Sequence, residues 1–160
     1  MAKNPMLIRV LTSDDIPVCA EMVASAPLWQ SYGLTPEIAA KRLQDALAND
    51  GLLLVADDGS GKPVGFVWML RRGAFDLSAY IRWLVVASTQ RSKGVGQKLL
   101  AAAEAQVQPP VRDVFLLCAD FNGDAQRFYE REGYRQMGTI PDYVITGVAE
   151  YIYRKRLSPP

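Results

Sequence analysis

The sequence predicts a single-domain α/β fold in which a mixed, mostly antiparallel sheet is flanked by about four helices. Three observations indicate this class. The chain has 160 residues, of which 49% are hydrophobic and 22% are charged, as in an ordinary globular domain. Short apolar runs typical of strands alternate with segments of helical periodicity. No repeat, low-complexity tract or long linker divides the sequence, so we expect one domain over residues 1–160.

The first elements are predicted from apolar spacing and cap-type residues. A strand is expected at 7–11, and cap-type residues at 12–15 then precede a helix whose apolar positions recur through 16–23. Residues 26–34 are expected to form a loop with exposed aromatic side chains. A second helix, over 35–49, begins with a threonine cap and a proline.

A β-hairpin comes next, because the runs LLLVADD and PVGFVWMLR flank a glycine-containing turn at 59–61. A further strand is expected at 80–87. It leads through QRSKGVG into an amphipathic helix that ends at Pro109 and Pro110. The residues expected on the inner face of this helix are Val95, Leu99, Ala102 and Ala103.

The last part of the chain is predicted to contain three strands and one more helix. A strand is expected at 113–119, and strands at 134–139 and 150–157 close the chain. The helix between them starts after Asn122 and stops at Gly133, which suits the left-handed position just past a helix. The resulting order, β-α-α-β-β-β-α-β-α-β-β, indicates a mixed α/β sheet.

The composition argues against several classes of function. A formal net charge of +1 provides no attraction to nucleic acid. The longest apolar runs, such as LLLVA and RWLVVA, fall short of the roughly 18 residues that span a bilayer. No uninterrupted apolar core precedes Asp14, so a secretory signal is not expected. We therefore expect a cytoplasmic protein without membrane or nucleic-acid partners.

Cysteine and histidine usage limits the chemistry further. Cys19 and Cys118 are far apart and lack metal-ligand spacing, so we expect reduced thiols in the core and no metal site. The chain has no histidine, which excludes Ser-His-Asp triads, Cys-His pairs and HExxH zinc sites. Catalysis is then left to carboxylates, tyrosines, backbone amides or water.

The most informative segment is LVVASTQRSKGVGQKLL, at 84–100. A strand enters a glycine-containing turn and then a helix, which directs free N–H groups and the positive end of the helix dipole at one place. Gly94 and Gly96 permit close approach to the backbone, and Arg91 and Lys93 add positive charge. The segment predicts an anion site, although the glycines alone are equally typical of a simple turn. Walker and dinucleotide loops are excluded, because the GK-Ser/Thr ending and the third glycine are absent.

Two motifs around this segment resemble those of the GNAT superfamily of acetyl-CoA-dependent N-acetyltransferases. Motif A is similar to Leu84-x-Val86 followed by Arg91-x-x-Gly94-x-Gly96. Motif B is similar to Asn122-x-x-Ala125-x-x-Phe128-Tyr129-Glu130-x-x-Gly133-Tyr134. The element order resembles the family fold over nearly the whole chain. Ser88 departs from a proline that the family often has, which affects a turn and no chemical group.

The resemblance implies a GNAT-like fold and an acyltransferase with acetyl-CoA as its cosubstrate. It implies that backbone amides from Arg91 to Gly96 hold the CoA pyrophosphate. It also implies that the pantetheine arm pairs with the strand at Leu84 and Val86, where one amide polarises the thioester carbonyl. The cofactor-binding residues expected on this basis are Leu84, Val85, Val86, Arg91, Ser92, Lys93, Gly94, Val95, Gly96, Gln97, Asn122 and Tyr129.

Two residues of the second motif have alternative roles. Asn122 suits a helix cap, and the resemblance implies a hydrogen bond to the cofactor arm, which a cap does not preclude. The resemblance favours Tyr129 as the catalytic general acid, because a phenol with a pKa of about 10 stays protonated at neutral pH and can donate to the leaving thiolate. The alternative is that Tyr129 packs inward with its hydroxyl bonded locally.

The residues that serve the acceptor are left open by the sequence. The candidates for the general base are Asp76, Asp120, Asp142, Glu150 and a chain of water molecules. Aromatic residues that could enclose the acceptor, or simply pack, are Trp29, Tyr32, Phe75, Tyr80 and Tyr143. The loop over 141–150 is expected to close over the acceptor.

The expected reaction is direct transfer of the acetyl group from acetyl-CoA to a primary amine of a small molecule. A covalent intermediate is not expected, since neither cysteine lies in a nucleophile motif. A protein or peptide amino-terminal acetyltransferase and a non-catalytic acyl-CoA sensor are the alternatives. The sequence does not specify the acceptor or the acyl group, and the final strand, EYIYRKRL, could pair between the subunits of a homodimer.

Overall fold

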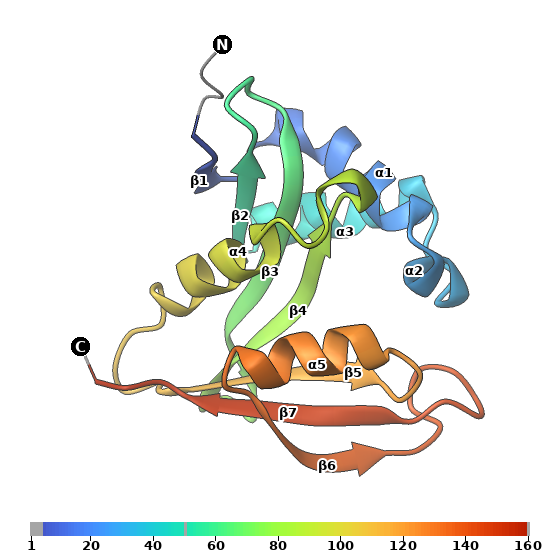
Figure 1. The fold of residues 1–160 in the computed structure, drawn as a ribbon, viewed down its shortest axis with the longest axis vertical. Coiled ribbons are helices and arrows are strands. Elements are labelled where there is room, and N and C mark those ends of the chain that lie inside the picture. Colours follow the sequence, from blue (N-terminus) through green and yellow to red (C-terminus); the bar gives the residue numbers. More distant parts are fainter. Residues whose placement is uncertain (1–4, 50, 160) are drawn as a thin grey trace. The chain divides into compact units, whose positions relative to one another are not determined.

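The computed structural model describes residues 5–49 and 51–159, and its elements follow the predicted order with one additional helix, α2 (Figure 1). The strands are β1 (Leu7–Val10), β2 (Leu52–Asp57), β3 (Pro63–Ala74), β4 (Ser78–Val86), β5 (Asp113–Ala119), β6 (Arg135–Ile140) and β7 (Glu150–Arg156). The helices are α1 (Ile16–Ser25), α2 (Pro27–Ser31), α3 (Pro36–Ala48), α4 (Val95–Glu104) and α5 (Gly123–Arg131), with short 3-10 turns η1 (Ser13–Asp15) and η2 (Ser88–Gln90).

The strands form a seven-stranded sheet in the order β1-β2-β3-β4-β5-β7-β6. The pair β4–β5 is parallel, whereas β1–β2, β2–β3, β5–β7 and β6–β7 are antiparallel. The predicted α/β class and the mostly antiparallel sheet are thereby confirmed. None of the helices in the described part of the chain has the length and apolar character needed to cross a membrane.

The chain forms two compact units, and β3 and β4 contribute residues to both. The first unit contains the described residues up to Met69 together with Trp83–Gln106, and the second contains Leu70–Arg82 and the described residues from Val107 onward. The expectation of one domain over 1–160 stays a prediction, and residues 1–4, 50 and 160 lie outside the described part of the chain.

The first unit is built around β2, which is buried along its whole length. Helices α3 and α4 both contact β2, and α1 packs against α3. Gly65 of β3 allows α4 to lie close, since a Cβ at this position would be 3.0 Å from the Val85 carbonyl oxygen and 3.1 Å from a Val95 methyl group. A larger residue would therefore displace the start of α4.

One difference from the predicted elements lies in 26–34, where a loop is expected and the structure contains α2. Pro27 stands at its first position, and the Trp29 ring packs on Trp83, with ring centroids 5.9 Å apart. A helix of five residues is too short to show a periodic pattern, so the tertiary packing of Trp29 decides it.

Helix α4 differs from the prediction at its inner face and at its end. The buried residues are Val95, Leu99, Leu100 and Ala103. Ala102, expected inside, is only half-buried, because the larger Leu100 occupies the core side instead. The helix ends at Glu104, before Pro109 is reached, so the prolines follow the end and do not cause it.

The second unit contains the pairs β4–β5, β5–β7 and β6–β7, with α5 packed against one face of the sheet (Figure 1). The α5 ring of Tyr129 lies 6.3 Å from the Tyr153 ring of β7, measured between centroids. The Tyr153 hydroxyl donates to Glu130 Oε1 at 3.3 Å. Tyr134 and Tyr153 are each 1% exposed and form the centre of this packing.

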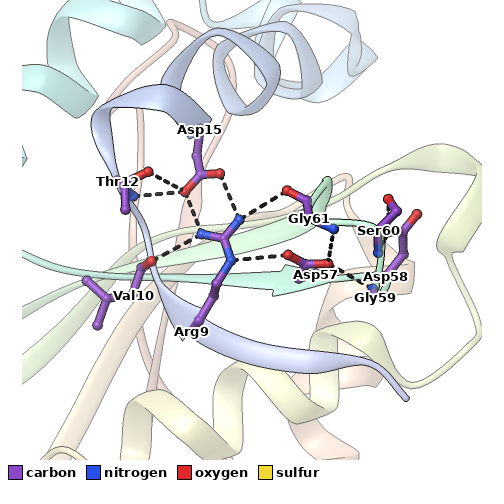
Figure 2. A network of polar contacts seen from close by, with 9 residues as sticks. All are labelled: Arg9, Val10, Thr12, Asp15, Asp57, Asp58, Gly59, Ser60 and Gly61. Atoms are coloured by element: carbon purple, nitrogen blue, oxygen red, sulfur yellow. Dashed lines mark hydrogen bonds and ion pairs between the residues drawn. The ribbon is translucent and has the colours of Figure 1, made fainter. Parts of the chain in front are cut away.

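A network around Arg9 joins β1, η1 and the β2–β3 turn in the first unit (Figure 2). Arg9 Nη1 and Nη2 donate to the two Asp15 carboxylate oxygens at 2.7 and 2.9 Å, and Nε donates to Asp57 Oδ2 at 3.1 Å. Asp57 Oδ1 also accepts from the backbone of Gly59 and Gly61. The two carboxylates are almost fully buried, with side chains 7% and 6% exposed.

Arg9→Met is expected to destabilise the protein by about 3 kcal/mol, because it leaves two buried carboxylates without their cation. Lys41→Met is the control, since Lys41 and Asp45 form an exposed pair with side chains 75% and 61% exposed, and is expected to cost less than about 0.5 kcal/mol. Urea unfolding at pH 7 measures both. Equal losses would contradict a special role for the Arg9 network.

The contribution of the Arg9 network to stability is also expected to depend on pH. The Arg9 hydrogen bond is the main cause that lowers the pKa of Asp15 below its ordinary 3.8. Desolvation raises the pKa of Asp57, but hydrogen bonds from Gly59, Gly61 and Arg9 outweigh it and lower that pKa also. A lowered folded-state pKa stabilises the protein above the unfolded value, and this is lost as the pH falls through the folded value. The stability gap between wild type and Arg9→Met should therefore shrink below about pH 4.

Candidate active site

The predicted anion loop is an exposed turn between β4 and α4 in the first unit. Residues 91–94 are all exposed, and Ser92 and Gly94 have left-handed backbone conformations, with φ of 62° and 77°. Nothing lies within 4 Å of the position that a Gly94 Cβ would take. Glycine suits position 94 because of the left-handed backbone angle there, and no neighbouring atom would obstruct a side chain.

The start of α4 has no side-chain cap. The starts of α1 and α2 also lack one, whereas Thr35 accepts a hydrogen bond from Ile38 N at the start of α3, and Asn122 accepts one from Ala125 N at the start of α5. The first amides of a helix have no acceptor within it, so those of α4 can bind an external group. With Arg91 and Lys93 in the preceding turn, this helix start suits an anion.

The predicted strand residues lie just before this turn, at the end of β4. Val85 is 4% exposed, so its side chain belongs to the core. Leu84 and Val86 alternate with it and are half-buried. Val64 O accepts a hydrogen bond from Ala87 N at 2.9 Å, which holds the end of the strand in place. Any contact of Val85 with a ligand would therefore use its backbone.

Asn122 and Tyr129, the other predicted cofactor-binding residues, belong to the second unit. The expected cap exists, because Asn122 Oδ1 accepts from Ala125 N at 3.3 Å. Its side-chain NH₂ group donates no hydrogen bond to any described residue. The cap and a ligand contact would thus use different atoms of the same side chain.

The Tyr129 ring is packed, but its hydroxyl is not tied down. Ring centroids lie 5.8 Å away in Tyr134 and 5.2 Å away in Phe128. Across the described residues, the hydroxyl has no hydrogen-bond partner. Desolvation, followed by the nearby Cys118 and Tyr80, raises the pKa of Tyr129. The phenol therefore stays protonated at neutral pH and is able to donate.

Both cysteines are buried thiols, as predicted. Desolvation is the main cause that raises the pKa of Cys19 and of Cys118 to about 12. Since the thiolate is the nucleophilic form, neither residue is activated for attack. Metal-ion ligand sets of three or more Cys, Asp or Glu residues are not found in the described ranges.

The four carboxylates considered as a base differ sharply in their surroundings. Asp76 and Asp142 are exposed in left-handed conformations, and Asp142 accepts from Gly147 N at 2.6 Å. Asp120 is also exposed and accepts from Ala149 N at 3.0 Å. Glu150, the first residue of β7, is only 3% exposed. The structure thus separates one buried carboxylate from three surface ones.

The aromatic residues considered for the acceptor fall into two groups. Trp29 and Tyr32 belong to the first unit, with ring centroids 5.9 Å apart. Phe75, Tyr80 and Tyr143 belong to the second. The Phe75 ring contacts the Phe115 ring of β5, with centroids 5.6 Å apart.

The sequence model of the acetyltransferase (GNAT) domain family matches residues 49–136, which is more than half of the chain. The chain therefore belongs to the GNAT acetyltransferase family and is an acyltransferase. No curated protein matches the sequence at a significant level.

Solved structures agree with this family in their fold. An acetyltransferase from Thermus thermophilus is 19% identical, with a TM-score of 0.77 over 98% of this chain and 100% of that one. An aminoglycoside 6'-N-acetyltransferase complexed with coenzyme A is 16% identical, with a TM-score of 0.77 over 97% and 99%. A proposed acetyltransferase from Salmonella typhimurium with its cofactor acetyl-CoA is 14% identical, with a TM-score of 0.76 over 98% and 96%.

Two substitutions at Asn122 separate the cap from a ligand contact. Asn122→Ala removes the cap and is expected to cost about 1 kcal/mol in urea unfolding. Asn122→Asp keeps a capping oxygen but removes the NH₂ donor, so stability should be unchanged while acetyl-CoA binding weakens about tenfold in calorimetry. Wild-type affinity in Asn122→Asp would show that the residue is a cap alone.

Proposed function

We propose that this acetyltransferase moves the acetyl group of acetyl-CoA directly to a primary amine of a small molecule. The observation that carries the proposal is the uncapped start of α4 behind the exposed turn at 91–94. A pyrophosphate supplies the negative charge and the acceptor oxygens that such a helix start lacks. The coenzyme A and acetyl-CoA complexes of two similar structures support this choice of donor.

The residues of the first unit suit the polar end of the donor. The amides of Val95, Gly96 and Gln97 stand at the helix start, and Ser92 lies in the preceding turn with a left-handed backbone conformation. Arg91 and Lys93 are exposed and add charge. The backbone of Leu84 and Val86 would pair with the amides of the pantetheine arm, as an added strand does. Acetyl-CoA supplies the activated acyl group.

The transfer itself forms a C–N bond and breaks a C–S bond. A backbone amide of β4 polarises the thioester carbonyl, and the neutral amine nitrogen attacks its carbon. The electron pair of the broken bond leaves with sulfur, and Tyr129 donates its phenolic proton there. Nitrogen then loses a proton to solvent, and Tyr129 recovers one from solvent.

Direct transfer is proposed in place of an acyl-cysteine route because both cysteine thiols are buried. A ping-pong mechanism needs a reactive thiolate, and the pKa of both Cys19 and Cys118 is raised to about 12. At neutral pH almost all of each thiol is protonated. The amine itself is therefore the nucleophile in the proposal.

Acetyl-CoA binding to the wild type and to Gly94→Glu tests the proposal by calorimetry. A carboxylate in the anion loop should weaken binding about 100-fold, since like-charge contacts cost several kcal/mol. Gly33→Glu is the matched control, because Gly33 has a similar φ of 73° and equally open space but lies outside the loop. Circular dichroism checks folding. Absence of binding by the wild type would overturn the proposal.

Tyr129→Phe is expected to lower kcat about 100-fold and to leave the Kd for acetyl-CoA unchanged. Its thermal stability should match the wild type, because the hydroxyl makes no hydrogen bond to the described residues. Tyr153→Phe, on the neighbouring ring, loses a hydrogen bond to Glu130 and should affect stability and not kcat. Undiminished turnover by Tyr129→Phe would remove its role as acid.

A further inference from the structure

Gln126, a half-buried residue of α5, ties this helix to the end of β5. Its side-chain amide nitrogen donates to Ala119 O and to Asp120 O, at 3.0 Å in each case. Carbonyl oxygens only accept hydrogen bonds, so the NH₂ group of the amide, and not its oxygen, faces them. The side chain therefore holds two successive carbonyl groups, and all three residues belong to the second unit.

The carbonyl groups that Gln126 binds are themselves fixed in the sheet. Ala119 is the last residue of β5 and is paired with Glu150 of β7. Asp120 continues the pairing, because its N–H donates to Ala149 O at 2.9 Å and its Oδ2 atom accepts from Ala149 N at 3.0 Å. Gln126 therefore connects the helix to two strands where their ends adjoin.

Asn122 attaches the start of α5 to the same strand. Its N–H donates to Ala119 O at 3.0 Å, and its Oδ1 atom accepts from Ala125 N at 3.3 Å. Both bonds lie at the first turn, about which a helix is still able to tilt. Gln126 reaches the strand from one turn further along the helix. Two separate points of attachment on the helix fix the direction of its axis, and Gln126 supplies the second.

Apolar packing fixes α5 less firmly than α4. None of the nine residues of α5 is fully buried, whereas α4 has four fully buried residues. Toward the C-terminal end of α5, the rings of Phe128 and Tyr129 are half-buried, and the exposed Glu130 accepts one hydrogen bond from Tyr153, at 3.3 Å. The two bonds of Gln126, at 3.0 Å, are therefore the shorter polar link between this helix and the sheet.

Tyr129 would be displaced if α5 tilted about its first turn. It follows Asn122 by seven residues, which corresponds to about 10 Å along a helix axis. A tilt of about 6° would then move Tyr129 by about 1 Å, while Asn122, at the pivot, would stay in place. A displacement of about 1 Å at a reacting group lowers a rate by up to about 100-fold.

We infer that Gln126 is a positioning residue for the reaction, and that it holds α5 at the angle which presents the Tyr129 hydroxyl to the leaving sulfur. This inference rests on the proposed function, in which Tyr129 is the general acid. Gln126 is not itself an acid or a base, because a side-chain amide does not titrate near neutral pH. It acts on the reaction only through Tyr129.

Two substitutions remove the contact and keep the side chain close to its original size. Gln126→Glu replaces the NH₂ group by an oxygen that cannot donate to a carbonyl when the carboxylate is ionised, and Gln126→Leu removes both polar atoms. Each should lower kcat about tenfold while the Kd for acetyl-CoA stays unchanged. Arg127→Met is the matched control on the next residue of α5, because Arg127 is exposed and its ion pair is with Asp124 of the same helix. It should leave kcat unchanged.

The readout is the release of CoA from acetyl-CoA, followed with a thiol reagent. Water, ethanolamine and 2-phenylethylamine are offered as acceptors, and the one that gives the fastest release by the wild type is used throughout. Circular dichroism checks the folding of each variant.

Gln126→Lys tests the contact from the opposite direction. Its ammonium group restores a donor that is able to reach the two carbonyl oxygens, so kcat should stay within about threefold of the wild type. Because this variant keeps the link to the strand, it tests the inference even if Gln126→Glu and Gln126→Leu do not fold. A tenfold loss of kcat in folded Gln126→Lys would contradict the inference.

A double-mutant cycle separates positioning of Tyr129 from a general effect on structure. In the Tyr129→Phe background the hydroxyl is absent, so Gln126→Leu should lower kcat by less than about twofold further. Independent effects multiply, and a general effect would therefore cost the same factor in both backgrounds.

The outcomes distinguish this inference from the proposed function. Wild-type kcat in folded Gln126→Leu and Gln126→Glu, or an equal loss in both backgrounds of the cycle, would overturn the role of Gln126 alone. Absence of acetyl-CoA binding or of CoA release by the wild type would overturn the proposed function and this inference together.

Discussion

Close packing at Gly65 is the constraint on which the candidate donor site depends. A Cβ there would stand 3.0 Å from the Val85 carbonyl oxygen and 3.2 Å from Leu99, so the strand accepts α4 only because residue 65 has no side chain. The position of α4 fixes its uncapped first turn behind the exposed residues 91–94. At the starts of α3 and α5 a side-chain oxygen, from Thr35 and Asn122, accepts a hydrogen bond from a backbone amide of the first turn. The position and the uncapped start of α4 therefore follow from what the sequence omits at two places, a side chain at 65 and a capping side chain at 94.

Desolvation has opposite chemical consequences for the two kinds of acidic group in the second unit. It raises the pKa of Cys118 to about 12, which removes the thiolate and with it a covalent route. It also raises the pKa of Tyr129, which keeps the phenol protonated and able to donate. One physical cause thus disfavours an acyl-cysteine and favours a tyrosine acid, which is consistent with direct transfer in a chain without histidine.

The two buried carboxylates of the first unit, Asp15 and Asp57, belong to one network around Arg9. Asp15 and Asp57 each bond Arg9, and Asp57 also accepts two backbone amides, so the network is closed and acts as a structural link (Figure 2). Through these bonds the network stabilises β1 against the β2–β3 turn.

The sequence by itself determined the order of elements, the α/β class and the two family motifs, because each is encoded in residues close together in the chain. Local spacing also predicted the cap at Asn122. Only the tertiary structure decided that 27–31 is helical, that Leu100 and not Ala102 is buried, and that Glu150 alone of four carboxylates lies inside. Burial and strand register depend on partners far away in sequence, such as Trp83 for Trp29 and Ala119 for Glu150. No local pattern contains those partners, and for that reason the two motifs were predictable whereas burial and register were not.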